Sequence, residues 1–124
     1  PRICLEMVEN GCLVLASMLA PHTANMIDQL QCQLPAAWTA RLQQSLRAIY
    51  CQRLVQAGEG WLPVSEFVQP ELACKWLASL GPRDYPRCLE KQKGSWSLLH
   101  SLQEWINEER ITTDEADKLV QSWS

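Results

Sequence analysis

The amino-acid sequence predicts an all-α fold, a compact bundle of six to seven short-to-medium helices. Apolar residues recur at helical spacing along almost the whole chain, and the alternation typical of strands is nearly absent. The composition, 47% apolar and 20% charged over 124 residues, is that of a globular protein long enough to bury a core. Prolines and glycines then divide the periodic pattern into separate helices.

The N-terminal part, residues 1–58, is expected to contain three helices. The first carries Gly11 on its apolar stripe, where a neighbouring helix could approach closely, and it ends before Pro21. Thr23 is a suitable N-cap for the second helix, and Gly58 is a natural end for the third. These helices are predicted over about residues 2–19, 23–34 and 36–57.

Residues 59–69 are interpreted as a connecting segment, because Gly60 and Pro63 interrupt any helical pattern there. The C-terminal part, residues 70–124, is expected to complete one continuous domain with the first. Its first helix is predicted to begin at Pro70 and to end at the Gly81-Pro82 pair. A second helix is predicted to begin after Ser95 as its N-cap, and a third at a capping box. The capping box is formed by Thr112 and Glu115.

Tryptophan is unusually frequent: the chain has six, against one phenylalanine and two tyrosines. Four lie on the apolar stripes of predicted helices and are expected in the core: Trp38, Trp76, Trp105 and Trp123. Trp61 and Trp96 lie off these stripes, so they are either locally packed or part of an aromatic docking surface. These two are the candidate anchors for a partner.

Charge is distributed unevenly. The whole chain has a net charge of −3, and a basic turn precedes an acidic C-terminal segment. The candidate binding residues of this turn are Arg83, Tyr85, Arg87, Lys91 and Lys93. They form either an ordinary solvated surface or a site for a charged partner, including a second copy of the chain. Nucleic acid is a weaker possibility, because four cations make a small phosphate footprint.

The C-terminal half loosely resembles the sterile alpha motif (SAM) domains. The matching positions, in order, are residues 75–81, Tyr85, Leu98-Leu99, Ile111-Thr112 and Leu119-Val120. The family usually has an aromatic residue where this chain has Leu89, and Asp-Gly where it has Ser95-Trp96. The resemblance implies head-to-tail or partner association through oppositely charged surfaces, and some members of the family bind RNA hairpins.

No pattern of a catalytic or cofactor site is present, so we expect no enzyme activity, no cofactor and no metal. The two histidines are 78 residues apart, no C-x-x-C occurs, and Gly58-Glu59-Gly60 lacks the rest of a phosphate-binding loop. The six cysteines are expected to be free thiols in a reducing compartment, with a secreted, disulfide-bonded protein as the open alternative. No apolar run is long enough to span a membrane.

The expected function is that of a non-catalytic helical protein–protein interaction or assembly domain, an adaptor or scaffold that binds another protein or itself. The alternative is a helical nucleic-acid-binding module that uses the basic turn over residues 83–93. The chain starts at Pro1 and is expected to belong to a longer protein. An intracellular location, cytoplasmic or nuclear, is expected.

Overall fold

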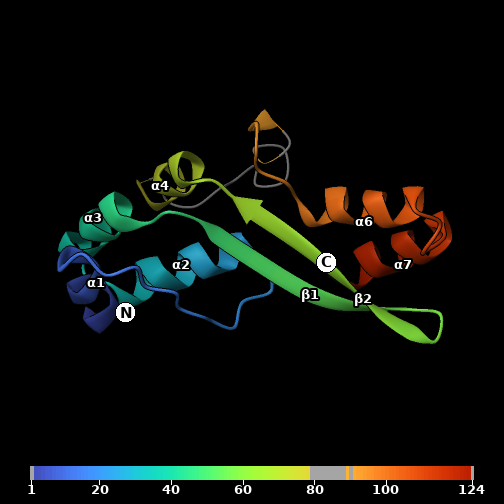
Figure 1. The fold of residues 1–124 in the computed structure, drawn as a ribbon, viewed down its shortest axis with the longest axis horizontal. Coiled ribbons are helices and arrows are strands. Elements are labelled where there is room, and N and C mark those ends of the chain that lie inside the picture. Colours follow the sequence, from blue (N-terminus) through green and yellow to red (C-terminus); the bar gives the residue numbers. More distant parts are fainter. Residues whose placement is uncertain (1, 79–88, 90, 124) are drawn as a thin grey trace.

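The computed structural model describes residues 2–78, 89 and 91–123. Within these residues the fold is mixed, with six helices and one two-stranded antiparallel sheet, so the expectation of an all-α bundle is wrong (Figure 1). The elements in chain order are α1 (Arg2–Glu9), α2 (Thr23–Gln33), α3 (Ala36–Ser45), β1 (Ile49–Ala57), β2 (Gly60–Val68), α4 (Pro70–Ala78), α6 (Leu98–Asn107) and α7 (Thr113–Trp123).

The first helix is much shorter than its apolar pattern indicates. Gly11 has a φ of +85°, and two backbone hydrogen bonds close the helix end, from Gly11 N to Val8 O and from Cys12 N to Met7 O. This is a Schellman motif, in which a glycine in the left-handed region ends a helix. Gly11 therefore terminates α1 instead of opening a contact with a neighbouring helix.

The predicted third helix is correct only as far as Ser45. Residues 46–48 then connect α3 to β1, which turns through Gly58-Glu59 and pairs with β2, in register from Ala57 opposite Gly60 to Ile49 opposite Val68. Gly58 has a φ of +56°, as the first position of a two-residue type II′ hairpin turn requires. The segment interpreted as a connection is thus the second strand of a hairpin.

The hairpin contributes residues to two apolar clusters, one at each end of its strands. Ile49 and Val68 pack with α2 and α4, whereas the strand residues nearer the turn pack with α6 and α7. Figure 1 shows the same arrangement, with α1 to α4 gathered at one end and α6 and α7 beside the other. In the described part of the chain, the hairpin is the element that contributes to both clusters.

The other helix predictions are largely right about existence and less so about boundaries. α4 begins at Pro70, and the Thr112–Glu115 capping box is confirmed by a 3.3 Å bond from Glu115 N to Thr112 Oγ1 and a 2.8 Å bond back from Thr112 N. Ser97, not Ser95, caps α6, because its Oγ accepts from His100 N. Gly81-Pro82 lies outside the described residues.

Of the four tryptophans expected in the core, Trp76 is buried and the other three are half-buried. Trp105 and Trp123 pack against the cluster under α6 and α7, and Trp38 lies beneath the guanidinium groups of Arg2 and Arg41. No helix of the described chain has the length and apolar character needed to cross a membrane.

Candidate protein-binding surface

The two faces of the hairpin differ in chemistry. Directly opposed residues of an antiparallel pair point to the same side, so the pairing register assigns each residue to a face. One face, here called the open face, holds Tyr50, Gln52, Leu54, Gln56, Trp61, Pro63, Ser65 and Phe67. It contains no charged side chain, whereas Arg53 and Glu66 both lie on the opposite, covered face.

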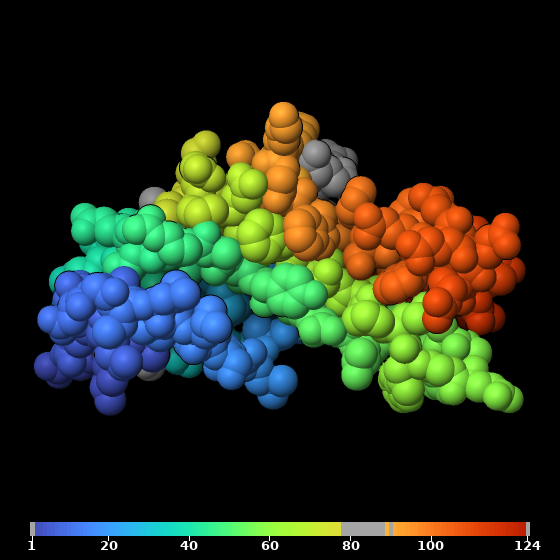
Figure 2. Space-filling view, in the orientation of Figure 1, coloured from blue at the N-terminus to red at the C-terminus, as the bar shows by residue number. Residues whose placement is uncertain are grey.

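Large apolar side chains on the open face are exposed to solvent. The exposed fractions are 56% for Tyr50, 63% for Leu54 and 65% for Trp61. In Figure 2 the green hairpin runs uncovered between the blue N-terminal helices and the orange C-terminal helices. An uncharged patch with exposed aromatic groups is the composition found at the centres of protein interfaces.

The structure places both candidate anchor tryptophans on this side of the hairpin. Trp61 lies next to the turn, opposite Gln56. Trp96 forms a β-bridge with Phe67 and stacks on its ring at a centroid distance of 4.9 Å, and its Nε1 donates to Ser65 Oγ over 3.3 Å. Phe67 is six residues from Trp61, or about 20 Å along the strand. Trp61 is therefore exposed, whereas Trp96 packs against the hairpin.

The basic turn is described only in part. Arg83, Tyr85 and Arg87 lie outside the described residues. Lys91 and Lys93 are exposed, and they precede Gly94, whose φ is +83°. A Cβ at Gly94 would lie 2.1 Å from Nε2 of Gln69, so a larger residue there would displace the Gln69 side chain.

The covered face carries a polar cluster that serves the fold. The carboxylate of Glu66, which is 1% exposed, accepts a hydrogen bond from the backbone N–H of Thr23 at the start of α2. Burial raises the pKa of Glu66 and lowers that of the neighbouring His22. Burial, together with the charge of Glu66, also raises the pKa of Cys51, the residue directly opposite Glu66.

The Cys51 thiol of this cluster is not activated as a nucleophile would be. A cysteine nucleophile needs a lowered pKa, whereas the pKa of Cys51 is raised. Arg53 is turned toward the ring of Trp123, with its guanidinium carbon 5.3 Å from the ring centroid. Among the described residues, no group of three histidine, cysteine or acidic side chains is placed to hold a metal ion.

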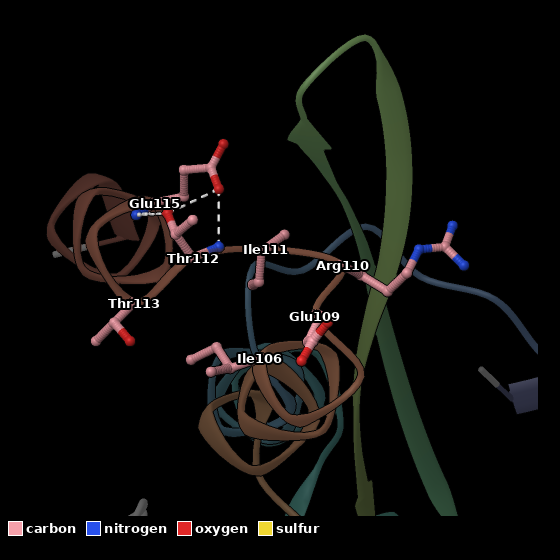
Figure 3. Close-up of a pocket in the computed structure, with 7 residues that line it drawn as sticks. All are labelled: Ile106, Glu109, Arg110, Ile111, Thr112, Thr113 and Glu115. Carbon is pink, nitrogen blue, oxygen red and sulfur yellow. Dashed lines mark hydrogen bonds between the residues drawn. The ribbon is translucent and has the colours of Figure 1, made fainter.

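The surface has two shallow hollows, one away from the open face and one at its margin. The first, of about 410 Å³, is at the turn between α6 and α7, where Thr112 and Glu115 bond to each other and Arg110 points away from the other lining residues (Figure 3). The second, of about 480 Å³, borders Trp96 and is lined also by Leu99 and His100. The first lacks converging polar groups, and the second is lined by both polar and apolar residues.

The sequence alone does not single out Tyr50 and Leu54, because its pattern predicts a helix over about residues 36–57. Their signal is the alternation along residues 49–57, in which Ile49, Cys51, Arg53 and Val55 point to one side. The charge of Arg53 within that series hides the alternation.

The comparisons with protein-family models, with curated proteins and with solved structures find no match for this chain.

Proposed function

We propose that this chain is a non-catalytic protein–protein interaction or assembly domain, and that a partner protein binds the open face of its hairpin. The observation that carries the proposal is the exposure of Tyr50, Leu54 and Trp61 together on a face without a charged residue. Leaving three such groups in water is unfavourable, and covering them with a partner would be stabilising by the hydrophobic effect.

The open face is suited to tight binding because the covered face of the same hairpin packs against the helices and fixes the backbone. The covered face of the hairpin contributes Ile49 and Val68 to one apolar cluster and Val55 to the other. A surface anchored in this way loses little conformational freedom when a partner binds, which lowers the entropic cost of association.

Trp61 is the expected anchor of the interface. Its ring supplies a large apolar area, and its indole N–H can donate one directional hydrogen bond. Neighbouring positions are uncharged: Gln56 lies opposite it, and Pro63 follows on the same face. The matching partner surface is an apolar, uncharged patch with a hydrogen-bond acceptor within reach of the indole.

Site-specific photocrosslinking tests this proposal without removing the anchor. A photoreactive amino acid replaces Gln56 on the open face, and the matched control carries it at Gln44, an exposed position on α3. We expect one protein to be trapped at position 56 and not at 44, and that protein, once purified, to bind the wild-type chain. Equal products at both positions, or none at 56, would contradict the proposal.

Nucleic-acid binding through the basic turn stays the alternative. Its described part consists of Lys91 and Lys93, both exposed. A mobility-shift titration at low and high salt separates the two functions, because phosphate contacts weaken steeply as salt rises. Absence of binding at low salt eliminates the alternative.

We further propose a reducing, intracellular compartment. The cysteines of the described residues are free thiols: Cys4, Cys12, Cys32, Cys51 and Cys74. Counting the thiols of the native protein after denaturation without reductant tests this proposal, because a secreted, disulfide-bonded form would show fewer than six.

A further inference from the structure

The outer edge of β1 presents backbone groups that pair with nothing in the described chain. The turn makes Ala57 and Gly60 a hydrogen-bonded pair, so alternate residues of β1, namely Tyr50, Gln52, Leu54 and Gln56, direct their N–H and C=O groups away from β2. No other strand joins the sheet on this side, and no backbone bond from the described residues reaches these positions. Such an edge is a template for another strand.

The opposite edge of the hairpin, along β2, is closed. Phe67 exchanges two backbone bonds with Trp96, and the N–H of Ser65 donates to Ser101 Oγ over 3.2 Å. Pro63 has no N–H, and its C=O accepts from Trp105 Nε1 over 2.8 Å. Within the described residues, hydrogen bonds therefore close the β2 edge, and none closes the outer edge of β1.

We infer that the outer edge of β1 pairs antiparallel with β1 of a second copy of this chain, giving a four-stranded sheet with both β2 strands outside. The inference concerns the backbone edge, whereas the proposed function concerns the side chains of the open face, so each can hold without the other. Because both β2 edges are closed, the assembly stops at a dimer with two-fold symmetry.

The sequence of β1 is suited to pairing with itself. With the two-fold axis at Gln52, Tyr50 of each copy lies beside Leu54 of the other on the same face of the sheet. These apolar side chains then make two lateral contacts, and the open face itself stays accessible to a partner protein. In the same register Arg53 lies opposite Cys51 of the second copy, an uncharged neighbour. An axis at Arg53 would instead place two guanidinium groups face to face, which is unfavourable.

In this register Gln52 of one copy lies opposite Gln52 of the other, which allows a charge-exchange test. The Gln52→Lys and Gln52→Glu variants each place like charges at the axis, so each alone should raise the dimer dissociation constant by about fivefold. An equal mixture of the two variants pairs opposite charges and should restore the dimer. The matched controls are Gln56→Lys and Gln56→Glu, on the same edge but opposite residue 48, beyond the end of the strand.

The readouts are light scattering after size exclusion and amide hydrogen exchange across a protein dilution series. We expect a wild-type dimer in which the amides of Tyr50 and Leu54 gain protection as concentration rises, and restoration only in the mixed Gln52 variants. Restoration also shows that the single variants are folded. A wild-type chain that stays monomeric at about 500 µM has a dimer dissociation constant in the millimolar range or weaker, and this result would overturn the inference. Mixed Gln52 variants that stay monomeric, or Gln56 controls that lose the dimer equally, would overturn it as well.

A wild-type chain that stays monomeric but binds an extended peptide of another protein at this edge also overturns the inference. The Trp61→Ala variant should dimerise normally, because Trp61 lies outside the paired segment of β1. Loss of the dimer in this variant counts against the edge as the interface.

Discussion

Glu66 on β2 caps α2, because its buried carboxylate accepts a hydrogen bond from the backbone N–H of Thr23, the first residue of that helix. The N-cap residue itself, His22, makes no side-chain capping bond. The first N–H groups of a helix need partners from outside it, and here a residue 43 positions along the chain supplies one. The cap therefore ties α2 to the sheet.

Replacing Glu66 should separate the effect of its hydrogen bond from that of its charge. Glu66→Ala removes the cap and should lower the free energy of unfolding by about 1–2 kcal/mol. Glu66→Gln keeps an acceptor oxygen and should cost less. Urea unfolding of both variants at neutral pH measures the difference, and equal losses would show that the cap contributes little.

The buried carboxylate of Glu66 should also make stability depend on pH, and a comparison of the wild type with Glu66→Gln tests this. Burial raises the pKa of Glu66 in the folded state above its ordinary value of 4.5, although the Thr23 bonds and the charge of Arg53 oppose the shift. The folded state then binds the proton more tightly, so the contribution of Glu66 to stability falls as pH rises from 4.5 through the raised pKa. Unfolding of the wild type minus that of Glu66→Gln should show this slope, and a rising difference would contradict it.

Trp61 and Trp96 should respond differently to alanine. Trp61→Ala removes an exposed side chain and should change the free energy of unfolding by less than about 0.5 kcal/mol. Trp96→Ala removes the stack on Phe67 and the bond to Ser65, and should cost about 2 kcal/mol. Thermal melts of the two variants test this, and similar losses would mean that Trp61 is also a packing residue.

Glu109 is a position where glycine should stabilise the fold. It ends α6 with a φ of +58°, and the bonds from Glu109 N to Ile106 O and from Arg110 N to Trp105 O form a second Schellman motif. The left-handed conformation costs a non-glycine residue about 1 kcal/mol, so Glu109→Gly should raise stability by about that amount. Gly11→Ala is the reverse change at the equivalent position of α1 and should lower it; a loss in both variants would contradict this explanation.

The cysteines should differ in reactivity toward an alkylating reagent. Burial raises the pKa of Cys51 and Cys74, and the Cys74 thiol donates to Gln43 O over 2.9 Å. Because the thiolate is the reactive form, both should be labelled more slowly at neutral pH than the exposed Cys12 and Cys32. Mass spectrometry of a timed reaction measures the order, and fast labelling of Cys51 would reopen a catalytic role for it.

The parts of the fold that depend on local signals were predictable from the sequence. Pro70 and the Thr112–Glu115 capping box start helices for reasons contained within one turn. The hairpin was missed because its alternation is broken by Arg53 and Glu66 on the covered face. Both are accommodated there by distant groups, the Trp123 ring and the Thr23 N–H, which a sequence does not place nearby.

The candidate site was predicted to a similar extent. Trp61 stands out in the sequence because it lies off every helical stripe, and the structure leaves its side chain exposed. Its role in binding stays a prediction. Tyr50 falls within the helix predicted over about residues 36–57, where it would lie close to the face of Ile49, whereas adjacent residues of a strand point to opposite sides. The error in secondary structure therefore concealed half of the open face.

The most direct test of the open face is the affinity of the crosslinked partner, once purified, for Trp61→Ala measured by isothermal titration calorimetry. Interface anchors of this type contribute about 2 kcal/mol or more, so we predict affinity at least about tenfold weaker than for the wild type, with an unchanged melting temperature. Gln44→Ala on α3 should bind as the wild type does. Equal affinities for the wild type and a folded Trp61→Ala would contradict the account.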